Sequence, residues 1–161
     1  MKQEEHNNRS EHPMNGDAPI AQSVDEVNHI IRTRIEKLGR IRAMGVNPFP
    51  YSYDRRHRVA DLLANWEVHE DGGEVFSIAG RLMAIRLMGK VAFTHLLDED
   101  HRLQIYFTRD HLGDAGWELF KLLDIGDIIG VKGRLFRTKT GERTLEATEL
   151  TLLAKNIRPL P

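Results

Sequence analysis

The stretch that decides the fold is residues 75–108, which reads VFSIAGRLMAIRLMGKVAFTHLLDEDHRLQIYFT. Its apolar residues recur at about every second position, and β-branched and aromatic side chains are frequent, which is typical of half-buried β-strands. Turn-forming residues interrupt this pattern at Met88 to Lys90 and at Asp98 to His101. The stretch therefore predicts three consecutive strands, at 75–87, 91–97 and 102–108.

Two further strands are predicted nearer the C-terminus, at 128–137 and 144–153, joined by a turn over Lys139 to Glu142. Gly80 interrupts the first strand, where a bend or bulge would let that strand serve both halves of a closed sheet. A short helix before the fourth strand is expected to end at Gly126, with the apolar residues Trp117, Leu119, Phe120 and Leu123. The order β-β-β-α-β-β predicts a mainly β protein with some α-helix, folded as a five-stranded OB barrel.

The residues before the barrel predict a tail and a long amphipathic helix. Ser23 and Glu26 form a capping box, and apolar residues then recur at steps of three and four up to Met44, where Gly45 ends the helix. That stripe comprises Val24, Val27, Ile31, Ile35, Leu38 and Ile41. A shorter helix is expected over 59–66. We accordingly expect a disordered tail over 1–22, a helical segment over 23–73 and the barrel over 74–161.

Composition excludes several classes of protein. The 161 residues include 23 Lys+Arg, 24 Asp+Glu and no Cys, for a net charge of −1, so a disulfide scaffold is excluded. No apolar run reaches the roughly 18 residues that a membrane helix needs, and no secretory signal is visible, so a cytoplasmic location is expected. Basic residues nevertheless concentrate over 32–58 and 77–97, which indicates either an anion-binding face or merely solvated surfaces.

Catalytic and metal-binding motifs are not found. There is no Walker loop, nucleophile elbow or GxGxxG motif, and no pair of histidines stands at ligand spacing beside carboxylates. The sequence therefore predicts no catalytic residue and no metal site in this span.

The second and third strands predict a ligand-binding face. If Asp98 to His101 form the loop, Phe93 lies opposite Tyr106, and His95 lies opposite Gln104. That face carries Phe93, His95, Arg102, Gln104 and Tyr106, whereas Leu96, Leu103, Ile105 and Phe107 point inward. An aromatic ring beside amides and cations suits a splayed nucleobase. An ordinary core position for Phe93 and a solvated position for Gln104 remain alternatives.

Longer runs carry a family resemblance over about residues 24–161. They include GVNPFP from Gly45, AGRLMAIRLMGKVAFTHL from Ala79, LQIYFTRD from Leu103, LLDIGDIIGVKGRLFRTKTGE from Leu122 and ELTLLAKNIRPLP from Glu149. The sequence resembles the N-terminal anticodon-binding domain of the class II lysyl-tRNA synthetase family. It departs from the family pattern at Ile85, where many members have a second arginine.

The resemblance implies roles for individual residues. Phe93 matches the phenylalanine that stacks on the central uridine of the anticodon, and Gln104 matches the glutamine on that base's edge. Arg86 and Glu142 match the residues that help fix the anticodon bases, although Glu142 by itself reads as a solvated turn residue. The resemblance also implies contacts to the tRNA backbone from Arg32, Arg34, Arg40 and Arg42 on the helix, with Lys90 a further candidate.

The resemblance also implies partners. The expected ligand is lysine tRNA through its anticodon stem-loop, with neither DNA nor a membrane as a partner. The family's catalytic domain, which uses ATP and Mg²⁺ to aminoacylate lysine tRNA and forms homodimers, would follow Pro161, so this span by itself is expected to need no cofactor and to catalyse nothing. A stand-alone module that binds single-stranded RNA and a subunit-assembly module remain alternatives.

Overall fold

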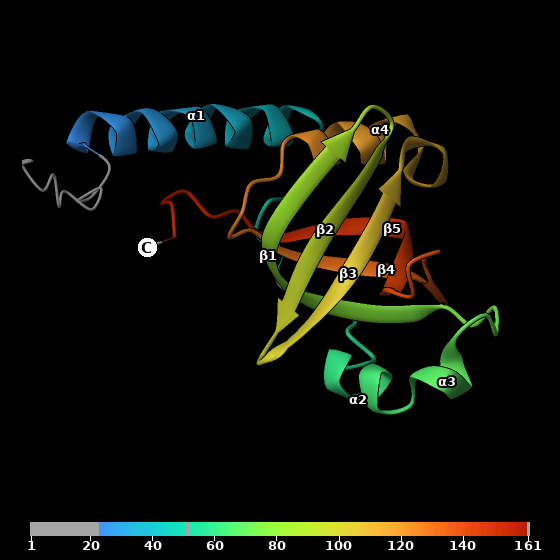
Figure 1. Cartoon of the computed structure of the whole chain (residues 1–161). Helices are drawn as coiled ribbons and strands as arrows, with labels where there is room; N and C mark the ends of the chain where they lie inside the picture. The colour runs from blue at the N-terminus through green and yellow to red at the C-terminus, as the bar shows by residue number, and fades with distance from the viewer. Residues whose placement is uncertain (1–22, 51, 161) are drawn as a thin grey trace, which may run out of the picture.

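The computed structural model describes residues 23–50 and 52–160 of the chain. In this part five strands form a closed barrel in the order β1-β2-β3-β5-β4 (Figure 1). Their bounds are β1 (Phe76–Met88), β2 (Val91–Asp98), β3 (His101–Thr108), β4 (Ile128–Arg137) and β5 (Arg143–Ala154). Each strand end lies within one residue of its predicted position, and the predicted OB topology is confirmed.

The first strand serves both halves of the barrel, as predicted. It pairs with β4 over 76–81 and with β2 over 81–88, so Arg81 has a partner on each side. The bulge, however, lies at Met83 and not at Gly80, because the register shifts between Leu82 and Ala84. Gly80 instead permits close packing, since a Cβ there would collide with the carbonyl oxygen of Leu97.

The barrel closes through a short parallel seam between β3 and β5. The seam has three residue pairs, Gln104 with Thr144, Ile105 with Leu145 and Tyr106 with Glu146. By contrast, the antiparallel β4–β5 ladder has ten pairs, Ile128–Ala154 through Arg137–Arg143. The seam is the only parallel pairing among the strands in the described residues, and it places two sequence-distant segments side by side.

The β2–β3 hairpin has the predicted register but a tighter turn. Asp98 still pairs with His101, so the turn consists of Glu99 and Asp100, and Glu99 adopts a φ of 54°. Asp98 is buried, and its carboxylate is hydrogen-bonded to the segment before β1. It accepts hydrogen bonds from the Val59 backbone N–H at 3.0 Å and from the Arg55 guanidinium at 3.2 Å. This fixes the start of the short helix that begins at Val59, before β1 in the chain, against the barrel.

Inward-pointing side chains fill the barrel as the strand parity predicts, with Leu96, Leu103, Ile105 and Phe107 at most 2 % exposed. Helix α4 (Arg109–Lys121) covers one end, where its Phe120 ring lies 4.7 Å from that of Phe107. This helix is longer than predicted and is kinked at Gly113, which has a φ of 75°. It ends at Lys121 rather than at Gly126, which forms the turn before β4 with a φ of 99°.

The long N-terminal helix is confirmed as α1 (Val24–Ala43), with the Ser23 hydroxyl accepting from the Glu26 N–H at 3.2 Å. Of its apolar stripe, Ile41 is fully buried, whereas Ile35 is 53 % exposed. The predicted helix over 59–66 is two short helices, α2 (Val59–Ala64) and α3 (Trp66–His69), which meet at Asn65. The predicted tail over 1–22 lies outside the described residues.

A buried ion cluster joins α1, the turn before β4 and the segment after β5. The Lys155 ammonium, with a side chain that is 0 % exposed, lies 2.7 Å from Asp124 and 2.9 Å from Asp127. Lys37 of α1 donates to Asp124 at 2.7 Å. Burial by itself raises the pKa of Asp124, but hydrogen bonds from Lys155 and Lys37 outweigh burial and hold this pKa below its ordinary value. Figure 1 accordingly shows α1 and the C-terminal segment on the same side of the barrel.

No helix in the described part of the chain is long and apolar enough to span a membrane.

Candidate functional site

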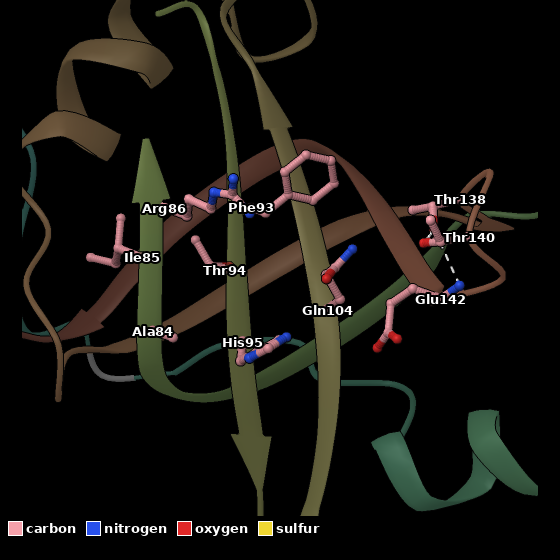
Figure 2. Close-up of a pocket in the computed structure, with 10 residues that line it drawn as sticks. All are labelled: Ala84, Ile85, Arg86, Phe93, Thr94, His95, Gln104, Thr138, Thr140 and Glu142. Atoms are coloured by element: carbon pink, nitrogen blue, oxygen red, sulfur yellow. Dashed lines mark hydrogen bonds between the residues drawn. The ribbon is translucent and has the colours of Figure 1, made fainter. Parts of the chain in front are cut away.

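A cavity of about 480 Å³ lies on the outer face of the barrel, over β1, β2 and β3 and beside the β4–β5 turn (Figure 2). Its lining residues are Ala84, Ile85, Arg86, Phe93, Thr94, His95, Gln104, Thr138, Thr140 and Glu142. The four residues predicted to contact bases, Phe93, Gln104, Arg86 and Glu142, are therefore brought together at one site. They come from three strands and one turn, and Glu142 lies 56 positions from Arg86 along the chain.

Strand register sets the side chains at the centre of the cavity. Phe93 pairs with Tyr106 and His95 pairs with Gln104, as predicted. The Phe93 ring lies 4.9 Å from the Tyr106 ring at an interplanar angle of 31°, and both side chains are half-buried on the outer face. A core position for Phe93 is therefore excluded. Its ring is supported by Tyr106 while it lines the cavity, which is the arrangement of an aromatic stacking platform.

Hydrogen bonds hold the β4–β5 turn that carries Glu142. The Thr138 N–H donates to the Glu142 carbonyl at 3.0 Å, and the Glu142 N–H donates to the Thr138 hydroxyl at 3.1 Å. Gly141, with a φ of 87°, provides the left-handed residue that the turn requires. The turn therefore fixes the backbone of Glu142 while its side chain stays exposed beside the cavity.

Two exposed side chains of opposite charge, Arg86 and Glu142, line the cavity. Arg86 and Glu142 are exposed, and among the described residues neither forms an ion pair. Arg86 pairs with Phe93 across β1 and β2, so a cation lies beside the aromatic platform. An aromatic face with flanking hydrogen-bonding groups of both kinds can hold a planar polar molecule such as a nucleobase.

His95 is a further lining residue that the sequence placed on this face but did not single out for a role. It lies directly across from Gln104, and Figure 2 shows its ring on the same side of the sheet as the Gln104 amide. The signal available from the sequence was strand parity. An imidazole adds a nitrogen donor or acceptor to the base-sized cavity.

The residues predicted to contact tRNA phosphates lie in two different environments. Arg32, Arg40 and Arg42 are exposed on α1, and Lys90 is exposed at the β1–β2 turn. The Arg34 side chain is only 11 % exposed, and it donates to the carbonyl oxygens of Asn156 at 3.3 Å and Arg158 at 3.2 Å. Arg34 is thus held by the chain itself, whereas the side chains of Arg32, Arg40 and Arg42 form no hydrogen bond or ion pair with the described residues.

Within the described residues, no group of three or more His, Cys, Asp or Glu side chains could hold a metal ion. Among the described residues, the cavity-lining hydroxyls of Thr94, Thr138 and Thr140 form no hydrogen bond to the side chain of His95 or Glu142. The cavity offers a ligand an aromatic ring, an amide, a guanidinium and a carboxylate.

Comparisons with known proteins agree with this geometry. Residues 76–160 match the tRNA anticodon family model, described as an OB-fold nucleic acid binding domain. A lysine–tRNA ligase of Listeria monocytogenes serovar 1/2a is 43 % identical over 143 residues, covering 85 % of this chain and 28 % of that protein. A lysine–tRNA ligase of Anaeromyxobacter sp. (strain K) is 45 % identical over 138 residues, covering 82 % of this chain and 27 % of that protein. The chain thus spans less than a third of the length of these relatives.

Proposed function

This chain belongs to the tRNA anticodon family of OB-fold nucleic acid binding domains, and from that premise we propose that it binds the anticodon loop of lysine tRNA as the recognition domain of a lysine–tRNA ligase. The observation that carries the proposal is the convergence of Phe93, Gln104, Arg86 and Glu142 on one cavity. The names of the relatives support the choice of lysine tRNA.

In the proposed mode of binding, bases of the anticodon loop unstack and the central uridine stacks on Phe93. Gln104, Arg86 and Glu142 then contact the edges of the anticodon bases. Stacking supplies affinity for any base, whereas hydrogen bonds to the base edges supply selectivity. The structure supports this division because Figure 2 shows the Phe93 ring with Arg86 on one side and Gln104 and Glu142 on the other, so that polar groups flank the ring.

Phosphate contacts are assigned to the exposed cations. Arg32, Arg40 and Arg42 on α1, together with Lys90, would neutralise the tRNA backbone without reading its sequence. Arg34 is the weakest candidate in this group, because carbonyl oxygens of the chain already accept its hydrogen bonds.

The remaining activity is proposed for the parent protein rather than for this span. We infer a cytoplasmic, homodimeric lysine–tRNA ligase that aminoacylates lysine tRNA with ATP and Mg²⁺ through residues outside this span. Within the parent, the barrel would position the tRNA by its anticodon while the reaction occurs elsewhere.

Fluorescence anisotropy with two anticodon stem-loops tests the proposal. The two RNAs differ only in the central base, uridine or cytidine, and are titrated at one moderate salt concentration. We expect clear preference for uridine. Equal affinity for both would contradict anticodon reading and favour a stand-alone module that binds single-stranded RNA.

A subunit-assembly role is the second candidate function, and the exposed apolar surface of α1 favours it, since Ile35 is 53 % exposed. Light scattering of the chain at increasing concentration separates the two functions. A stable dimer that binds neither stem-loop would support assembly over recognition.

A further inference from the structure

Thr144 lies where the barrel seam meets the cavity. It is the Cα partner of Gln104 in the short parallel pairing between β3 and β5, and its side chain is fully buried. Its hydroxyl oxygen contacts both the Gln104 amide and the Glu142 carbonyl. Resting on the proposed function, we infer that Thr144 is a positioning residue that fixes the Gln104 amide and thereby selects uridine over cytidine.

The direction of the hydrogen bonds follows from the number of protons available. A threonine hydroxyl has one proton to donate and two lone pairs to accept with. The Thr144 hydroxyl oxygen lies 3.1 Å from the Glu142 carbonyl oxygen. A carbonyl oxygen can only accept, so the Thr144 hydroxyl is the donor in this hydrogen bond.

With that proton in use, Thr144 can only accept from Gln104. The contact between the Thr144 hydroxyl and the Gln104 amide, 3.2 Å, must therefore involve the amide nitrogen as the donor. The reversed amide would bring its oxygen against an oxygen that has no proton to offer. This repulsion, and not the hydrogen bond alone, determines which way the amide faces.

The β4–β5 turn favours this direction by holding the backbone of Glu142 in place. The Glu142 carbonyl also accepts from the Thr138 N–H at 3.0 Å, and the Glu142 N–H is bound to the Thr138 hydroxyl at 3.1 Å. The backbone acceptor that holds the Thr144 proton is therefore itself fixed. Successive hydrogen bonds thus connect Thr138 to Glu142, Glu142 to Thr144 and Thr144 to Gln104, and we call this chain of hydrogen bonds the relay.

The relay decides what Gln104 presents to a base. Figure 2 shows the amide nitrogen on the side of the β4–β5 turn and the amide oxygen on the side of His95. The cavity consequently offers an acceptor at the base edge. Uridine has an N–H donor at ring position 3, whereas cytidine has a lone pair there, so cytidine would bring two acceptors together.

The experiment compares the uridine and cytidine stem-loops across variants of Thr144. Wild type is expected to bind the uridine stem-loop about tenfold or more tightly than the cytidine stem-loop. The reason is that cytidine would leave its ring nitrogen and the Gln104 amide oxygen, both acceptors, without a donor. Thr144→Val keeps the shape and removes the hydroxyl, so the amide can turn, and the preference should fall to within about threefold. Thr144→Ser keeps the hydroxyl and should retain the wild-type preference.

Two further measurements separate this role from a structural one. Urea unfolding confirms that each variant is folded, and Thr144→Ala removes the same hydroxyl without the Val side chain. A double-mutant cycle with Gln104→Met then tests whether Thr144 acts through Gln104. In the Gln104→Met background, Thr144→Val should leave the ratio of uridine to cytidine affinity unchanged.

The outcomes distinguish this inference from the proposed function. If wild type binds both stem-loops equally, the proposed function fails and the inference fails with it. If wild type favours uridine and folded Thr144→Val and Thr144→Ala retain that preference, only the inference is overturned. Loss of preference in both variants, with rescue in Thr144→Ser, supports it.

Discussion

The ion cluster beside α1 and the cavity over β1, β2 and β3 differ in whether their charged side chains are paired. In the cluster, Lys155 is fully buried and contacts both Asp124 and Asp127. Around the cavity, Arg86 and Glu142 are exposed, and neither forms an ion pair within the described residues. The difference teaches that charges paired inside the fold hold it together, whereas charges left exposed on a concave surface are available to a ligand.

The largest expected effect comes from removing the buried cation. Lys155→Met keeps an unbranched side chain but leaves Asp127, which is 0 % exposed, without its cation. The free energy of unfolding should fall by about 3 to 5 kcal/mol, measured by urea denaturation. Lys132→Met is the matched control, because its pair with Glu149 at 3.6 Å is exposed and should contribute less than about 1 kcal/mol. Equal losses of unfolding free energy in the two variants would contradict the claim that the buried ion cluster stabilises the fold more than an exposed ion pair does.

A smaller effect is expected from one carboxylate of the same cluster. Near neutral pH, Asp124→Asn should lower the free energy of unfolding by about 1.5 to 3 kcal/mol, because it weakens charge-assisted hydrogen bonds. Burial raises the pKa of Asp124, but the hydrogen bonds and charges of Lys155 and Lys37 hold it below 3.8 overall. A carboxyl with a lowered pKa stabilises the fold above its unfolded pKa, and this contribution is lost as the pH falls through the folded pKa.

The measurement is urea denaturation of wild type and Asp124→Asn at decreasing pH. The gap between the two proteins should narrow below the ordinary aspartate value of 3.8, because the variant has no carboxyl there to protonate. A gap that stays constant into the acid range would show that the Asp124 charge does not stabilise the cluster.

On the cavity side, Phe93→Ala should act on binding. Losing one base–aromatic stack typically costs about 1 to 3 kcal/mol, which is roughly a fivefold to over a hundredfold loss of RNA affinity. Phe49→Ala is the matched control, because Phe49 is 45 % exposed yet does not line the cavity. Anisotropy with the uridine stem-loop compares the two. If both variants bind like wild type, Phe93 is not the stacking platform.

The strands and the binding face could be predicted because their signals are local. Alternating apolar residues and turn residues determine which side of β2 and β3 faces outward, so the pairing of Phe93 with Tyr106 follows from the sequence. The bulge at Met83 could not be predicted in the same way. It depends on how β1 pairs with two different strands, and Gly80 was the more visible irregularity.

The environments of the charged side chains on α1 could not be predicted from sequence patterns. Arg32 and Arg34 look alike on the helix, yet Arg34 is bound by carbonyl oxygens more than 120 residues away. Thr144 likewise has no local signal, because its partner Gln104 lies 40 residues away and they meet only when the barrel closes. The hydrogen bond between Gln104 and Thr144, which forms only when the barrel closes, is the part of the site that the sequence did not predict.

The short seam between β3 and β5 has a further consequence for motion. Three pairs close the barrel there, against ten between β4 and β5, and we therefore expect this ladder to need the least free energy to open locally. Gln104 and Thr144 form one of those three pairs. Local opening of the seam would therefore separate Gln104 from Thr144 and also part the buried core residues Ile105 and Leu145. A ligand that contacts both β3 and the β4–β5 turn would oppose that opening.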